Sequence, residues 1–167
     1  MKDNELSQAG EPAGASVQCQ ASPRHRILVV DEDSDLRLLY AEVLARPGYH
    51  VDAAEDGIAG WEALQAHNYN LLITEHSLPR LTGVELIRKL RAARMDVPVV
   101  MATVRLPAQK LALDPSLQLA AMLSKPFYIS ELLETVKAIL RATDSACGQI
   151  ASPPTWLGQP SATGLRL

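Results

Sequence analysis

Short apolar runs separated by segments of helical periodicity constrain the fold of this chain most. The strongest run is 27–30, Ile-Leu-Val-Val, which is rich in β-branched residues. Uninterrupted runs of this kind are typical of strands buried on both faces of a parallel sheet. A first helix is expected after Asp33 or Ser34, which can cap it, and Pro47-Gly48 is expected to stop it. The start of the chain therefore indicates a strand followed by a helix.

The same alternation continues along the chain. Strands are predicted over residues 27–30, 50–54, 71–74, 97–102 and 121–123. Helical segments separate them, although 107–119 is less regular because Pro115 can interrupt a helix. Ser130 is expected to cap the last helix. Five strands alternating with about five helices predict an α/β fold with a single doubly wound parallel sheet covered on both faces.

Composition divides the chain into one domain and two tails. With 167 residues and an apolar fraction of 47%, the chain can fill a single core. We expect a disordered leader over 1–23, a domain over 24–142 and a disordered tail over 143–167, because the tails have few large apolar side chains to offset their ordering entropy. Trp156-Leu157 and Leu165 are exceptions. They could form a short docking peptide or belong to a passive tail.

Charge, cysteine content and hydropathy exclude several classes of protein. The formal net charge of −3 gives no electrostatic reason to expect nucleic-acid binding. The two cysteines, Cys19 and Cys147, suit a reducing compartment better than a disulfide framework. No secretion signal is visible, and no apolar run approaches the roughly 20 residues that span a bilayer. We expect a soluble cytoplasmic protein without membrane contact.

Polar side chains follow the predicted strands where a doubly wound sheet binds its ligands. These residues are Asp31-Glu32-Asp33, then Glu75, Thr103 and Lys125. Because the carboxyl ends of parallel strands meet at one edge, we expect one shared site. Neighbouring carboxylates repel unless a cation lies between them, and Mg²⁺ prefers such oxygen ligands. The Lys125 ammonium and Thr103 hydroxyl could contact a carboxylate or a phosphoryl oxygen.

Each of these residues alone has an ordinary structural interpretation. Asp31 or Asp33 could cap the first helix, and Thr103 could be an ordinary strand-end hydroxyl. Lys125 could be a surface charge, and Pro126 after it makes a cis peptide bond plausible. The joint arrangement favours a site, because four strand ends deliver two acids, a hydroxyl and an ammonium in a fixed order.

Several segments together resemble the receiver domain of two-component response regulators, which has a flavodoxin-like fold. The resemblance extends from about Arg24 to Ala142. It rests on order, spacing and flanking turn residues. The segments are 27–33, 71–75, Leu78-Pro79, Thr82-Gly83, 99–103 and Lys125-Pro126-Phe127.

The resemblance implies a role for each site residue. Glu75 matches the aspartate that accepts a phosphoryl group from a histidine kinase. Asp31, Glu32 and the main-chain carbonyl of Ser77, together with the acceptor carboxylate, would hold Mg²⁺. Thr103 and Lys125 would contact the phosphoryl oxygens. Phosphorylation would bias a surface formed by the fourth helix, fifth strand and fifth helix, which is also a candidate for partner docking or a homodimer.

Four residues depart from the family pattern, and Glu32 in the acidic pair is the mildest change, which metal binding could survive. Glu75 moves the carboxylate by more than about an ångström relative to an aspartate, which is enough to spoil an in-line attack. The longer side chain could also imitate the phosphorylated state by bringing charge to Thr103 and Lys125. Val104 replaces a small residue at the mouth of the site, and Met122 replaces a switching aromatic side chain.

We therefore expect a stand-alone pseudo-receiver of a phosphorelay system, which docks a histidine kinase or another signalling protein and performs no enzymatic turnover. The alternative is a receiver that still accepts a phosphoryl group with Mg²⁺, on Glu75 or another acid such as Asp31. An unrelated nucleotide-binding enzyme is disfavoured because no glycine-rich phosphate loop follows residues 27–30. An aspartate-nucleophile phosphatase is disfavoured because no supporting insertions or cap are apparent. The partner, the signal and the effect of Glu75 on switching are left open.

Overall fold

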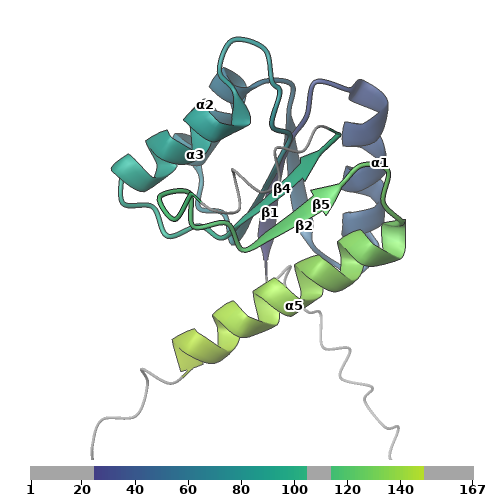
Figure 1. The fold of residues 1–167 in the computed structure, drawn as a ribbon. Helices are drawn as coiled ribbons and strands as arrows, with labels where there is room; N and C mark the ends of the chain where they lie inside the picture. Colours follow the sequence, from purple (N-terminus) through teal and green to yellow (C-terminus); the bar gives the residue numbers. More distant parts are fainter. Residues whose placement is uncertain (1–24, 105–113, 149–167) are drawn as a thin grey trace, which may run out of the picture.

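All five predicted strands are present in the structure, which is a computed structural model describing residues 25–104 and 114–148. The elements follow one another as a strand and a helix in turn until the segment before the last strand (Figure 1). Their bounds are β1 Arg26–Val30, α1 Ser34–Ala45, β2 His50–Ala54, α2 Gly57–Ala66, β3 Leu71–Thr74, α3 Gly83–Ala92, β4 Val99–Thr103, β5 Ala121–Ser124 and α5 Ile129–Gly148.

The strands form one parallel sheet in the order β2-β1-β3-β4-β5. Helices α1 and α5 cover one face, and α2 and α3 cover the other (Figure 1). The predicted doubly wound α/β sheet is therefore confirmed. The described residues contain four helices. Of the irregular segment predicted over 107–119, residues up to 113 lie outside the described part of the chain, and the following residues include a turn.

The central strands are buried on both faces, as their apolar sequences predicted. In β1, Leu28 and Val30 pack into the core beneath α2 and α3, whereas Ile27 and Val29 pack into the core beneath α1 and α5. All four side chains are at most 1% exposed. Because successive side chains of a strand point to opposite faces, one apolar run supplies both cores.

Helix α1 begins as the sequence predicts. The Asp33 carboxylate caps it by accepting hydrogen bonds from the main-chain N–H groups of Asp35 and Leu36. Its C-cap is Arg46, and Gly48 follows with a φ of 95° in the left-handed region that favours glycine. The Asp33 cap fixes the loop that carries the acidic residues after β1.

Helix α5 differs from the prediction at both ends. It begins at Ile129, so Ser130 lies within the first turn and does not cap it. The Tyr128 carbonyl already accepts hydrogen bonds from the N–H groups of Glu131 and Leu132. At the other end the helix continues to Gly148, so the tail predicted to start at Thr143 begins with six helical residues. Residues 149–167 and 1–24 lie outside the described part of the chain.

Candidate functional site

The strand register places the two acidic strand ends side by side. Val30 pairs with Thr74 across β1 and β3, so the next residues, Asp31 and Glu75, leave the sheet as neighbours. The chain connections leave β1 and β3 toward opposite sides of the sheet, so the topological switch point lies between these two strands. Doubly wound sheets bind their ligands at this point. The first strand connects to β2 on one side, and the third strand leads to β4 on the other. The predicted meeting of these acids follows from the topology.

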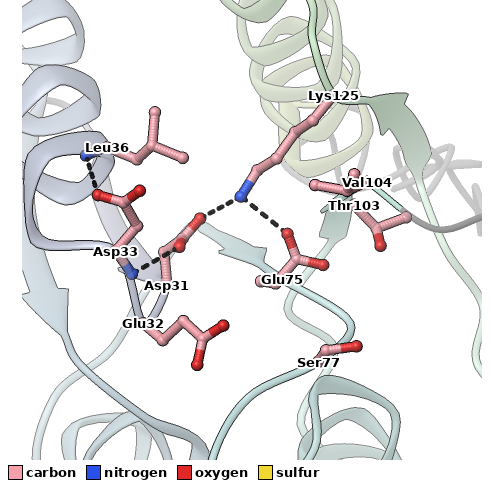
Figure 2. A pocket seen from close by; sticks show the side chains of 9 residues that line it. All are labelled: Asp31, Glu32, Asp33, Leu36, Glu75, Ser77, Thr103, Val104 and Lys125. Carbon is pink, nitrogen blue, oxygen red and sulfur yellow. Dashed lines mark hydrogen bonds and ion pairs between the residues drawn. The ribbon is translucent and has the colours of Figure 1, made fainter.

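Lys125 lies between the two carboxylates and contacts both (Figure 2). Its ammonium Nζ is 2.5 Å from Asp31 Oδ2 and 2.8 Å from Glu75 Oε2. The side chains are 11%, 4% and 9% exposed for Lys125, Asp31 and Glu75 respectively. Burial strengthens the attraction in each ion pair because the local dielectric is low, but it also removes water from the charged groups. The three groups form one buried charged cluster with one positive and two negative members.

The remaining oxygens of the two carboxylates also have partners. Asp31 Oδ1 accepts a hydrogen bond of 3.0 Å from the Asp33 N–H, and Glu75 Oε1 accepts one of 2.8 Å from the His76 N–H. Each acid is therefore held by one main-chain donor and one ammonium. Both carboxylates are fixed in place by groups of this chain.

The charge cluster sets the pKa of Lys125. Burial works to lower the pKa of this ammonium, but hydrogen bonds from it to Asp31 and Glu75 and their negative charges outweigh burial. The pKa of Lys125 is therefore raised above its ordinary value of 10.5. The positive form is favoured, because it is the form that the two acids bind.

This raised pKa predicts a loss of stability at alkaline pH. The contribution of Lys125 is fully present below 10.5 and is lost as pH rises through the higher folded-state pKa. Urea unfolding between about pH 9 and pH 11.5 is expected to show a falling free energy of unfolding. The Lys125→Met variant is the control, since tyrosines titrate in the same range. An equal slope in both proteins would contradict the prediction.

Arg37 is a site residue that the sequence analysis missed. Its Nη1 donates to the main-chain carbonyls of Asp31 at 2.6 Å and Glu32 at 3.0 Å. This side chain fastens the acidic loop onto the first turn of α1. An arginine after an acidic strand end is the only sequence signal, and arginines are equally common on exposed helix faces.

The loop after β3 is held by a second pair that the sequence did not reveal. Asp56, which is 3% exposed, caps α2 through the N–H groups of Ile58 and Ala59 and also forms an ion pair with Arg80. Arg80 has a φ of 65° and lies in the loop between Glu75 and α3. The position of that loop is thus tied to the start of α2.

The predicted residues around the cluster line a pocket of about 380 Å³ (Figure 2). Glu32 is exposed, and its carboxylate points away from the Lys125 ammonium. Thr103 is buried at the end of β4, and Val104 at the rim is 69% exposed. Ser77 lies in the loop that follows Glu75 and lines the pocket from there. The structure therefore gathers these strand-end residues around one opening.

Met122 is the one predicted residue outside this group. It lies in β5 beside Met101 of β4 and is half-buried against the core beneath α2 and α3. The pocket lining does not include it. The peptide bond between Lys125 and Pro126 is cis, in agreement with the sequence expectation.

The donor chemistry of the pocket suits Mg²⁺, but the geometry does not form a metal site. Carboxylate and carbonyl oxygens are the ligands that this ion prefers. Within residues 25–104 and 114–148, no group of three or more His, Cys, Asp or Glu side chains is placed to hold a metal ion. The Lys125 ammonium bridges the two buried acids, and Glu32 points elsewhere. The arrangement is built around an internal ammonium.

Comparison with known proteins identifies the family. Residues 27–137 match the response regulator receiver domain. This chain belongs to the response regulator receiver family. It is 31% identical over 120 residues to the response regulator receiver protein CpdR of Brucella abortus, and the match covers 70% of this chain and 98% of that protein.

Another relative is longer than the matched region, and a third has a solved structure. The response regulator MprA of Mycobacterium ulcerans is 33% identical over 130 residues, covering 75% of this chain but 56% of that protein. Among solved structures, the response regulator TrrA of Thermotoga maritima in complex with Mg²⁺-BeF matches with a TM-score of 0.62 and 30% identity, over 69% of this chain and 98% of that chain. The receiver domain is therefore a module of two-component signalling in this chain too.

The helices of the receiver do not have the properties of membrane spans. In the part of the chain that the structure describes, every helix falls short of the length or apolar character that crossing a bilayer requires.

Proposed function

We propose that this receiver is a pseudo-receiver that acts through protein docking and is not controlled by phosphorylation of an aspartate. Glu75 stands at the strand end where the receiver resemblance expects the phosphate-accepting aspartate. The observation that carries the proposal is the contact of 2.8 Å between Glu75 Oε2 and the Lys125 ammonium. That ammonium is the group expected to contact a phosphoryl oxygen.

The geometry supports this proposal in two ways. A carboxylate oxygen attacks efficiently only when it is held in line with the bond that breaks. In this chain Oε1 of Glu75 accepts the His76 N–H and Oε2 accepts the Lys125 ammonium. The extra methylene of Glu75 also lets its charge reach Lys125 without a phosphoryl group between them. The charge contact that phosphorylation would create is thus already present.

The output of a pseudo-receiver has to pass through contacts with other proteins. The proposed partner is a histidine kinase or another signalling protein of a phosphorelay, met in the cytoplasm. Nucleic-acid binding is not part of the proposal, because the net charge of the chain is −3. The docking face predicted on the fourth helix, fifth strand and fifth helix falls partly on residues 105–113, outside the described part of the chain. Homodimerisation through it stays a prediction.

Titration with Mg²⁺ and then beryllofluoride, followed by NMR, tests the proposal. The wild type is expected to show no widespread shifts on beryllofluoride addition, whereas Glu75→Asp is expected to respond, because the shorter side chain leaves room beside Lys125 and Thr103. The matched control is Glu62→Asp, the same substitution at an exposed position of α2. It should behave as the wild type.

Two results bear on what Glu75 does. If the wild type already has the spectrum of the beryllofluoride-bound Glu75→Asp variant, Glu75 imitates the phosphorylated state; if it has the spectrum of the free variant, Glu75 only removes the switch. Equal responses of the two proteins would contradict the proposal. So would stoichiometric acid-labile phosphate on Glu75 after treatment with a small phosphodonor and Mg²⁺.

A further inference from the structure

Exposed apolar side chains gather next to the charged pocket. Among the described residues, five large apolar side chains are exposed, and four of them lie on α1, after β4 or before α5. These four are Leu38, Leu39, Val104 and Tyr128, and the most exposed is Tyr128 at 82%. Single exposed apolar residues are ordinary, but a cluster at one edge marks a surface that another group covers.

An apolar groove of about 360 Å³ has two of these exposed side chains, Leu39 and Val104, in its lining. Helix α1 forms one wall, and the turn into α5 forms the other, where Phe127 stacks on Tyr40 with ring centroids 5.8 Å apart. Its apolar lining consists mainly of Leu36, Leu39, Val104, Pro126, Phe127 and Ile129. The groove is large enough for one or two aliphatic side chains.

The groove and the charged pocket share a wall made by Leu36, Val104 and Lys125. The pocket side carries four carboxylates against the single ammonium of Lys125, and Glu32 and Asp33 are exposed. The nearby Arg37 guanidinium is directed at main-chain carbonyls. A ligand that covers both surfaces therefore needs apolar side chains next to a positive charge.

We propose that the groove binds the Leu165-Arg166-Leu167 segment of this same chain. Leu165 and Leu167 flank Arg166, which is the only charged side chain after Gly148. The leucines enter the groove, and the Arg166 guanidinium pairs with the Glu32 and Asp33 carboxylates at its rim. Arginine suits this task because its planar fork binds carboxylates through two parallel hydrogen bonds.

Chain length allows this contact and disfavours the other apolar part of the tail, Trp156-Leu157. The groove lies at the start of α5, and the tail leaves from its end, about 30 Å away for a helix of 20 residues. Leu165 follows Gly148 by 17 residues, which span up to about 56 Å extended and about 23 Å on average. Trp156 follows by only eight residues, or at most about 29 Å. The last leucines reach the groove with slack, whereas Trp156 would reach it only with the intervening chain fully extended.

The N-terminal residues are a poorer occupant on grounds of charge and position. Residues 1–23 contain Asp3, Glu5 and Glu11 against Lys2, and the acidic pocket repels this excess of negative charge. The first strand, β1, also begins at Arg26, at the amino ends of the strands, whereas the pocket lies at their carboxyl ends.

Binding of the segment would regulate the access of a partner protein to the groove. A tether of this length gives an effective concentration in the millimolar range, so even a weak contact competes with a partner. The partner would then have to displace the segment, which lowers its apparent affinity. This inference does not depend on whether Glu75 accepts a phosphoryl group, and each can fail without the other.

NMR of the full chain tests the inference through the methyl groups of Leu39, Val104 and Ile129. Arg166→Glu and Leu165→Ser are each expected to shift these signals toward the positions found when residues 160–167 are deleted. Glu32→Lys combined with Arg166→Glu is expected to restore the wild-type positions, because the reversed pair attracts again. The control is Trp156→Ala, which should leave the groove signals unchanged. None of the tail substitutions changes a residue of the folded domain.

Two outcomes of the deletion experiment would overturn the inference. One is that deletion of residues 160–167 leaves the groove methyl signals where they are in the wild type. The other is that the shifts between wild type and deletion variant disappear on dilution, which would assign the contact to a second copy. A synthetic peptide of residues 160–167 is expected to bind the deletion variant at least tenfold more tightly than the full chain, and equal affinities would also contradict self-binding.

Discussion

Lys125→Met is expected to lower the free energy of unfolding by about 3 kcal/mol, because removing one member of a buried charge cluster leaves the others unpaired. Methionine keeps the length of the side chain but lacks the ammonium. Asp31 and Glu75, which are 4% and 9% exposed, would then face each other without the positive charge. Like charges at this separation repel strongly where water is excluded. Urea unfolding at neutral pH measures the change.

Two control variants separate this charge effect from a loss of packing. Lys137→Met changes an exposed lysine of α5 and is expected to alter stability by less than about 0.5 kcal/mol. Lys125→Met combined with Glu75→Gln removes one unpaired charge and should recover part of the loss. If Lys125→Met proves as mild as Lys137→Met, the cluster is more hydrated than its burial indicates. A mild effect of Lys125→Met on stability would not change the results expected from the Mg²⁺ and beryllofluoride titration.

Gly83→Ala is expected to destabilise the protein by about 1–3 kcal/mol and to disturb the site, because no space exists for a side chain there. A Cβ at Gly83 would lie far inside van der Waals contact with the carbonyl oxygen of Glu75. That carbonyl belongs to the main chain and cannot turn away as a flexible side chain would. The N–H of Gly83 also donates to the His76 carbonyl at 3.0 Å. The variant should therefore move the loop that carries Glu75.

Gly48→Ala is the matched control for this substitution. Gly48 has a φ of 95°, and a Cβ there would have no heavy atom within 4 Å, so alanine costs only backbone strain of about 1–2 kcal/mol. The two variants differ in the NMR signals of the site. Gly83→Ala is expected to shift the amides of Glu75 and His76, whereas Gly48→Ala is expected to leave them unchanged. Unchanged site amides in Gly83→Ala would contradict the close approach.

The strands and the residues at their ends were predictable because the signals are local. The run 27–30 is apolar at every position and rich in β-branched residues, which is typical of a strand buried on both faces. The Asp33 cap of α1 likewise follows from neighbouring residues. Topological rules then bring the carboxyl ends of the strands to one edge. The gathering of Asp31, Glu75 and Lys125 needed no knowledge of their contacts.

The end of α5 was predicted wrongly because the composition of its last residues does not distinguish them from the residues that follow. The stretch from Thr143 to Gly148 is polar and small, like the residues after it. In the structure His25, before β1, contacts Asp144 at 2.9 Å, and a partly apolar groove lies against Ala142 and Ala146. Contacts between residues at opposite ends of the domain therefore accompany the extra turns of helix.

The sequence by itself determined the fold class, the family resemblance and the residue types at the site, since periodicity and motif spacing are properties of the linear chain. The tertiary structure decided how those groups pair. Lys125 binds both acids, Arg37 holds the acidic loop, and Leu36 joins the charged pocket to an apolar groove. Each of these contacts depends on side chains from separate elements meeting at ångström distances, and a linear pattern carries no such distances.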